Sequence, residues 1–174
     1  AGGEGMIRLV LVVTLLLGSA VAQEGPVATA ARKQIMERAH HLLDAAKEMP
    51  AEKYEFKASE KQMTFGHMVF HTARANFALC SLVVGERSQF PQDLKDTDAK
   101  DKLVPVLEQS VTYCDGVLAK VSDKNLGETL KTPWGAEMTR AELLLEINAD
   151  QADHYSLAAT YLRLNGLLPP TAKK

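Results

Sequence analysis

Residues 139–166, TRAELLLEINADQADHYSLAATYLRLNG, carry the clearest structural signal in the chain. Thr139 and Glu142 have the spacing of a capping box, and Asn165 and Gly166 follow the last periodic residue, so the segment predicts one long helix ending at Leu164. A heptad pattern assigns six residues to the inner side of this helix: Leu143, Ile147, Asp150, His154, Leu157 and Tyr161. Two of the six are ionisable, which is unusual for a core-facing position.

Three further helices are expected from apolar residues spaced three and four apart. They span approximately residues 29–49, 64–83 and 98–121, and Pro50 ends the first of them. Pro105 lies deep in the third, so we expect a kink or a later start there, with Thr97 or Asp98 as the N-cap. No strand pattern competes. Four helices of about 20 residues joined by long connections predict an all-α four-helix bundle.

Composition and charge fit one globular domain and exclude several functions. The 174 residues are 46% hydrophobic and 24% charged, which suits a single core. The formal charge is 20 minus 22, or -2, and no run of Lys or Arg occurs, so nucleic acid is not an expected partner. Residues 122–138 include Trp134 and form the longest late connection, which we expect to act as a lid.

The N-terminal segment predicts export. From Met6 the sequence reads MIRLVLVVTLLLGSAVAQEG, with one Arg, an apolar run, and Ala20 and Ala22 in an A-x-A arrangement. The apolar run is too short to cross the roughly 30 Å hydrocarbon core of a membrane comfortably, although an uncleaved anchor is the alternative. We therefore expect a periplasmic or extracellular protein with no stable membrane anchor after cleavage.

This interpretation divides the chain into four parts. They are a tag or upstream artefact (residues 1–5), a cleavable signal peptide (6–22), a mature N-terminal tail (23–28) and the four-helix bundle (29–174). Export would place Cys80 and Cys114 where disulfides persist. A bridge between them and a pair of small buried thiols are both compatible with the sequence.

Asp150 and His154 are candidate metal ligands. They lie one helical turn apart on the predicted inner side, and an uncompensated buried charge costs several kcal/mol. Buried charges are therefore neutralised, hydrogen-bonded or bound to a metal. The two side chains can direct a carboxylate and an imidazole toward one ion, or they can form a hydrogen-bonded pair within the helix.

A third ligand would come from a facing helix, and His71 is the candidate. Met68 and Ala75 flank it at inner-face spacing, whereas His67 lies nearer the edge of the apolar stripe. His40 and His41 are adjacent and point about 100° apart, so they cannot both face the core. Two imidazoles and one carboxylate suit a divalent Zn, Ni, Fe or Mn ion with open positions.

Two segments resemble the DinB/YfiT-like family. The stretch 64–80, TFGHMVFHTARANFALC, is similar to the family's second helix, in which a His is followed by a small residue and Asn; this selects His71, with Ala73 and Asn76 after it. The stretch 150–170, DQADHYSLAATYLRLNGLLPP, resembles the family's C-terminal pattern, where a ligand pair four apart precedes Tyr and the run Y-L-R-x-N-G-x-x-P-P.

The resemblance implies a four-helix bundle that binds a divalent metal through three histidines and often dimerises. Here Asp150 stands where the family usually has His. The resemblance also implies a metal-dependent transferase acting with low-molecular-weight thiols, although such thiols are mainly cytosolic and export argues against them. A metal-dependent hydrolase is the second enzymatic hypothesis. The alternative is a non-catalytic metal- or small-ligand-binding bundle, related to stress, with an unidentified small molecule as ligand.

Overall fold

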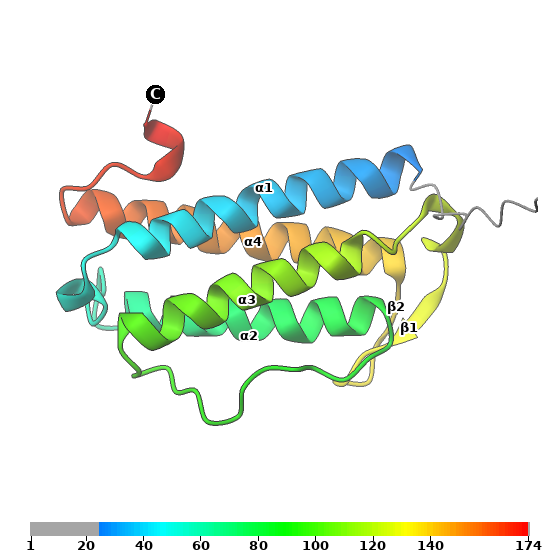
Figure 1. The fold of residues 1–174 in the computed structure, drawn as a ribbon, viewed down its shortest axis with the longest axis horizontal. Coiled ribbons are helices and arrows are strands. Elements are labelled where there is room, and N and C mark those ends of the chain that lie inside the picture. Colours follow the sequence, from blue (N-terminus) through cyan, green and yellow to red (C-terminus); the bar gives the residue numbers. More distant parts are fainter. Residues whose placement is uncertain (1–24, 174) are drawn as a thin grey trace, which may run out of the picture.

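The computed structural model describes residues 25–173 of the chain. The predicted upstream segment and signal peptide fall within residues 1–24, outside the described residues, and both stay predictions. Four long helices make up most of the described part: α1 (Pro26–Glu48), α2 (Phe65–Val83), α3 (Lys100–Leu118) and α4 (Arg140–Leu164). They run side by side along one axis (Figure 1). The structure thus confirms the predicted four helices and the mainly helical fold.

Short elements occupy the connections. They are the 3-10 turns η1 (Ala51–Lys53), η2 (Asp123–Asn125) and η3 (Pro170–Ala172), and an antiparallel hairpin of β1 (Thr129–Lys131) and β2 (Glu137–Thr139). The hairpin shows that the expectation of no strands was wrong. Each strand has only three residues, too few for a two-residue period to be visible in the sequence. Gly135 in the turn has a φ of +86°, a region that glycine adopts readily.

The first and last helices begin for reasons that are visible in the sequence. Helix α1 starts at Pro26, three residues before the predicted start, because proline is well suited to the first helical turn. Helix α4 has the predicted capping box, in which the Thr139 hydroxyl accepts a hydrogen bond from the Glu142 amide and the Glu142 carboxylate accepts one from the Thr139 amide. The predicted end at Leu164 is also observed.

The start of α3 differs from the prediction. The helix begins at Lys100 and follows Ala99, which provides no side-chain cap. Asp98 does not cap the helix because its carboxylate accepts a hydrogen bond from the Lys95 amide at 2.9 Å. Pro105 remains inside the helix on its exposed side, where water can hydrate the carbonyl left without an amide partner.

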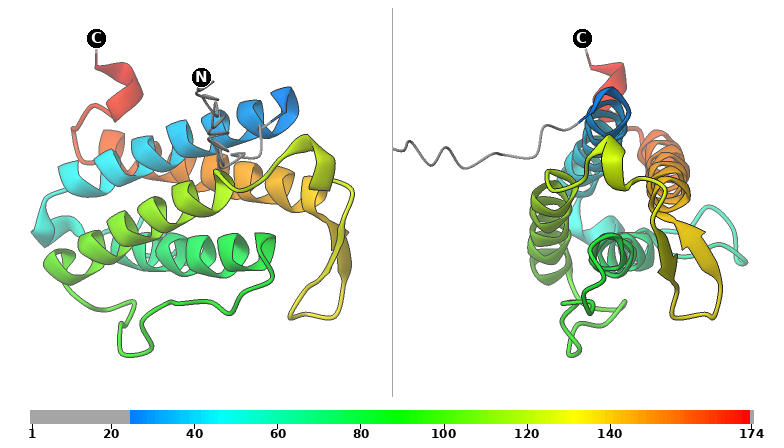
Figure 2. Two further views of the ribbon diagram at one scale, coloured as in Figure 1. Left: turned by 45° about the vertical axis from the view of Figure 1, so that its right-hand side comes forward. Right: turned by 90° about the vertical axis from the view of Figure 1, so that its right-hand side faces the viewer.

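The helices pack as two principal pairs, α1 with α4 and α2 with α3, around a common core (Figure 2). The residues predicted for the inner face of α1 are all buried: Ile35, Ala39, Leu42, Ala46 and Met49. A disulfide joins Cys80 of α2 to Cys114 of α3 across a sequence separation of 34 residues. Of the two alternatives left open by the sequence, the structure therefore shows the bridge.

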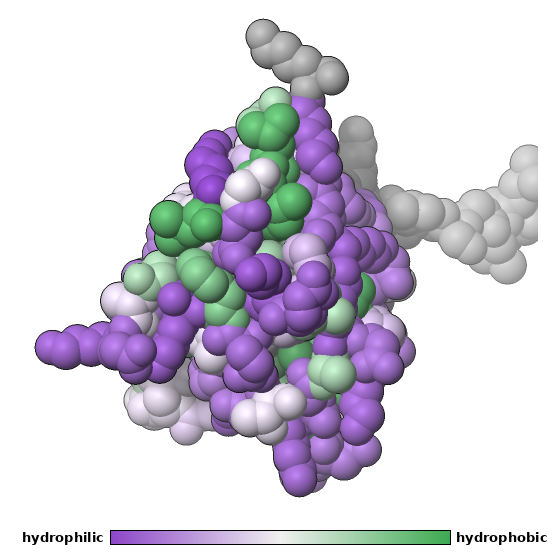
Figure 3. Space-filling model, turned by 90° about the vertical axis from the view of Figure 1, so that its left-hand side faces the viewer, coloured by the Kyte–Doolittle hydropathy of each residue, from purple (hydrophilic) through white to green (hydrophobic). Residues whose placement is uncertain are grey.

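The end of the bundle where α4 stops has an apolar surface. Figure 3 faces this end and shows hydrophobic groups gathered near the C-terminal tail, beside a mainly hydrophilic area. Leu164 and Leu168 are among the large hydrophobic side chains exposed in the described part of the chain, at 58% and 61%.

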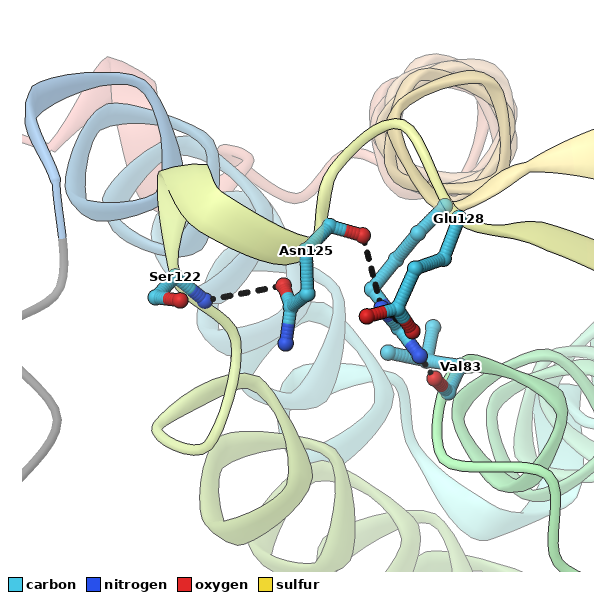
Figure 4. A network of polar contacts seen from close by, with 5 residues as sticks. Val83, Ser122, Asn125 and Glu128 are labelled. Atoms are coloured by element: carbon cyan, nitrogen blue, oxygen red, sulfur yellow. Dashed lines mark hydrogen bonds and ion pairs between the residues drawn. The ribbon is translucent and has the colours of Figure 1, made fainter.

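Arg140 fastens the connection 122–138 to the end of α2. Its Nε donates to the Val83 carbonyl at 2.9 Å, and its Nη1 donates to the Asn125 carbonyl at 2.7 Å and to the Glu128 carboxylate at 2.8 Å. Figure 4 shows Val83, Asn125 and Glu128 converging on this point. The connection is therefore anchored at the end of the bundle where α2 finishes and α4 begins.

We expect Arg140→Ala to lower the free energy of unfolding by about 2–4 kcal/mol, because it removes charge-assisted hydrogen bonds and leaves buried carbonyls without a donor. Urea unfolding followed by circular dichroism measures the change. Arg87→Ala, at an exposed position after α2, is the matched control and should stay within about 0.5 kcal/mol of wild type. An Arg140→Ala protein as stable as the control would contradict the anchoring role.

Candidate metal centre

Helices α2 and α4 bring the three predicted ligands together. One ligand atom from each of His71, Asp150 and His154 can be chosen so that all lie within 4.8 Å of one another. The His71 and His154 rings have centroids 4.9 Å apart and planes inclined by 31°. Residues 79 positions apart in the sequence thus converge, and two imidazoles and a carboxylate share one small volume.

Helix α4 orients its two donors through a local hydrogen bond. His154 Nδ1 lies 2.7 Å from the Asp150 carbonyl oxygen, and since a carbonyl only accepts, Nδ1 carries the proton. The Nε2 lone pair of His154 is therefore available to a metal, as in many metal-binding histidines. The Asp150 carboxylate is farther from the ring, with Oδ1 at 3.4 Å from Nδ1. The ring proton is thus directed to the backbone rather than to the carboxylate.

Asp150 Oδ2 is the atom that best tests whether the site fits a cation. It is buried and has no hydrogen-bond partner in the described structure. Leaving a buried acceptor unpaired is unfavourable, and more so for a charged group. A cation between Asp150 and the two imidazoles would compensate this oxygen, so the donor set fits a divalent metal.

The pKa shifts describe the metal-free centre. Burial raises the pKa of Asp150, and the two histidines act in the opposite direction. Burial also lowers the pKa of His71, and the positive charge of His154 adds to this effect. Both changes favour the uncharged forms, which are the carboxylic acid of Asp150 and the neutral imidazole of His71. Neutral imidazole is the form that coordinates metals, and a bound cation would favour the ionised carboxylate.

The centre lies at the side of the bundle and not in its core, which corrects the sequence prediction. His71 is exposed, and the Asp150 and His154 side chains are 20% and 13% exposed. The fully buried residues of α4 include Ile147, Gln151 and Ala158. The buried side of α4 also includes Leu144, Gln151 and Leu162, so its inner face is centred to one side of the predicted stripe, and Asp150 and His154 lie at its edge.

Buried polar side chains form a hydrogen-bond network between the proposed metal centre and the core of the bundle. Gln151 donates from its amide to Asn76 Oδ1, and Asn76 donates to the Ser110 hydroxyl at 3.0 Å. Ser110 in turn donates to the Leu107 carbonyl at 2.7 Å. This network connects α4, α2 and α3 behind the ligands. Gln151 was not among the residues predicted for the inner face of this helix.

The other histidines lie outside the group of three. His67, one turn before His71, has Nδ1 2.8 Å from an Asp96 carboxylate oxygen. The His40 ring bonds to the Met36 carbonyl of its own helix, and the His41 ring lies 5.3 Å from that of Tyr155. His71, and not His67, is therefore the histidine of α2 that lies close to both Asp150 and His154.

The position of the hairpin does not support the predicted lid. Asp150 lies ten residues after Arg140, which corresponds to about 15 Å along α4 from the point where the connection is fastened. The hairpin projects from the end of the bundle (Figure 2), and Trp134 is 60% exposed.

The comparisons with known proteins agree with this fold. A DinB superfamily model matches residues 34–158, a range that includes all three candidate ligands. No match was found among curated protein sequences. A solved DinB-like protein from Bacillus cereus ATCC 10987 is 18% identical, with a TM-score of 0.64 over 82% of this chain and 93% of that chain. A conserved protein from Enterococcus faecalis is 16% identical, with a TM-score of 0.62 over 79% and 96%.

A structure of the mycothiol-dependent maleylpyruvate isomerase is also similar. It is 17% identical, with a TM-score of 0.61, and the match covers 74% of this chain. The chain therefore spans only 59% of the isomerase's length. At these identities the similarity to solved structures shows a shared fold. The family match covers most of the chain, and the chain therefore belongs to the DinB superfamily.

Proposed function

We propose that His71, Asp150 and His154 bind one divalent metal ion, and that the protein is exported and uses this ion as a metal-dependent transferase or hydrolase acting on a small molecule. Two observations carry the proposal: ligand atoms of the three residues lie within 4.8 Å of one another, and Asp150 Oδ2 is buried without a hydrogen-bond partner. Membership of the DinB superfamily adds support, because the family typically binds divalent metals.

The three residues would have distinct roles. His154 offers Nε2 because its Nδ1 proton is committed to the Asp150 carbonyl, and Asp150 supplies the negative charge. His71 is the exposed ligand, so solvent and substrate reach the centre on its side. Three protein donors suit Zn, Ni, Fe or Mn with positions left for a ligand. A bound ion would supply Lewis acidity and lower the pKa of a coordinated water or thiol.

The disulfide supports the exported part of the proposal. Disulfides persist in oxidising compartments such as the bacterial periplasm and the extracellular medium, and they are rare in the cytosol. In the described part of the chain, no helix has the length and apolar character needed to span a membrane.

We also propose a homodimer, since Leu164 and Leu168 expose apolar surface at one end of the bundle. Sedimentation analysis of the mature protein tests that assembly.

The alternative is a non-catalytic metal- or small-ligand-binding bundle related to stress. In the described part of the chain the site offers three ligands, and both cysteines are joined in the disulfide, so no free thiol serves as a nucleophile there. Binding without turnover is therefore the second candidate. In the enzymatic case, hydrolysis is favoured over thiol transfer, because low-molecular-weight thiols are mainly cytosolic.

Metal analysis of the mature protein tests the proposal. Expressed with export and purified without chelators, it should contain about one divalent ion per chain. Hydrolytic and thiol-dependent assays then separate the two candidates: turnover that disappears with the metal supports an enzyme, and stoichiometric metal without turnover supports the alternative. A folded protein that takes up no Zn, Ni, Fe or Mn contradicts the metal centre.

Asp150→His should preserve or tighten metal uptake, because it restores the three-histidine set that the family resemblance implies. Imidazole and carboxylate both coordinate these metals, and the substitution keeps a donor at the same helical position. Competition with a chromogenic chelator compares the affinities of the two proteins. A folded Asp150→His protein with a clear loss of uptake would count against Asp150 as a ligand.

A further inference from the structure

A hollow of about 440 Å³ lies on the outer side of α2, beside the proposed metal centre. Its volume falls in the range of small-ligand sites. One wall comes from α2 and the other from the connection between α2 and α3. The lining includes Phe70 and Arg74 of the helix and Ser88, Phe90 and Leu94 of the connection.

The wall opposite α2 is held in place by contacts on both sides of the hollow. The Phe90 ring packs edge-on against the Phe70 ring, with centroids 5.3 Å apart, and lies 6.3 Å from the Phe77 ring. Asp96, farther along the same connection, bonds to His67 at 2.8 Å. The hollow therefore exists before any ligand arrives, which reduces the entropy lost on binding.

Arg74 is the charged group of this hollow. It follows His71 by three residues, so the two side chains are neighbours on the surface of α2. Among the described residues, the Arg74 side chain has no hydrogen bond or ion pair. Arg74 thus lines the hollow and lies within one helical turn of the proposed ligand His71.

The charges on α4 make the α2 side the favourable approach for an anion. Glu146 and Asp153 lie on α4 four residues before and three residues after Asp150, so they place negative charge next to the centre on the α4 side. Arg74 places positive charge on the α2 side. A ligand with a carboxylate or phosphate group is repelled from one side and attracted to the other.

We propose that the hollow binds a small molecule carrying one oxyanion, a carboxylate or a phosphate, which pairs with Arg74 while an apolar part packs against Phe70 and Phe90. A guanidinium binds either oxyanion through paired N–H donors. Binding in the hollow does not need the metal. Only its role in a reaction rests on the proposed function, because the metal centre would act on the part of the bound molecule that lies beside His71.

Benzoate and phenyl phosphate are the probes, and benzyl alcohol is the uncharged control. Calorimetric titration of the mature protein, with and without bound zinc, should detect both anions and show weaker binding of benzyl alcohol. Arg74→Gln should weaken anion binding by about tenfold or more, since it removes a charged hydrogen-bond donor. Arg87→Gln, an exposed arginine that does not line the hollow, should bind as wild type.

The outcomes separate this inference from the metal proposal. Anion binding that persists without metal and falls in Arg74→Gln supports the hollow, even if no metal ever binds. Equal affinity in Arg74→Gln and wild type overturns the inference, as does the absence of binding by either anion. Binding that needs zinc and ignores Arg74 also overturns it, because the anion would then be a ligand of the metal alone.

Discussion

Replacing His154 by alanine should abolish stoichiometric metal binding and leave the bundle folded. The variant loses the imidazole whose Nε2 is left free by the hydrogen bond from Nδ1 to the Asp150 carbonyl. Changes in groups that merely orient a metal ligand lower affinity about 10–100-fold, so loss of a ligand should exceed about 100-fold. Elemental analysis of the purified protein and competition with a chromogenic chelator measure the loss.

His40→Ala is the matched control for this experiment. The His40 ring makes the same 2.7 Å contact with a carbonyl four residues earlier, but it lies outside the group of three. Its metal content should equal that of wild type. A chelator should lower the melting temperature of wild type and of His40→Ala, and it should not affect His154→Ala, because only a bound ligand shifts the unfolding equilibrium. Full metal content in a folded His154→Ala protein would refute the assignment of this ligand.

Loss of the disulfide should have the largest effect on stability. The bridge closes a loop across 34 residues between α2 and α3, and the loss of chain entropy in the unfolded state corresponds to about 3–4 kcal/mol. The Cys80→Ala, Cys114→Ala double variant should therefore be less stable than the oxidised wild type by about this amount. Urea unfolding in the presence and absence of a reductant measures it.

The same double variant serves as the control for the reductant. Its unfolding curve should not change when reductant is added, whereas that of the wild type should move toward the curve of the variant. The thiol content of exported wild type, measured in denaturant without reductant, should be close to zero. Two free thiols per chain would contradict the bridge and remove its support for export.

The fold could be predicted from the sequence where a helix has a long apolar period and a distinct start. Helix α4 is the best example, because the Thr139–Glu142 capping box and the end at Leu164 both appear as expected. The five residues predicted for the inner side of the first helix are also buried, although four further buried residues were not predicted: Ala28, Met36, Leu43 and Ala45. The hairpin was not, because each of its strands is only three residues long and its pairing depends on a turn around Gly135.

The candidate ligands could be named from the sequence, but their surroundings could not. The one-turn spacing of Asp150 and His154 placed two donors together, and the resemblance to a known family chose His71 over His67. Depth in the bundle was misjudged because the predicted stripe followed Asp150 and His154, whereas the buried side of α4 passes through Gln151. The contact of Gln151 with Asn76, like that of His67 with Asp96, joins distant segments and requires the fold.

The role of Arg74 in the neighbouring hollow could not be predicted from the sequence either. In the sequence it is one arginine within the stretch 64–80, where the family resemblance points to His71, Ala73 and Asn76 and not to Arg74. Its importance comes from the connection after α2, which returns along the helix and places Phe90 against Phe70. No pattern in residues 85–99 predicts that path.

Anomalous X-ray diffraction from crystals of the zinc-loaded mature protein tests the central claim most directly. Data collected on both sides of the zinc absorption edge should show one strong peak per chain, within about 2.0–2.3 Å of a donor atom from each of His71, Asp150 and His154. A single peak at another place in the molecule, or no peak between these three side chains in crystals that contain stoichiometric zinc, would contradict the proposed metal centre.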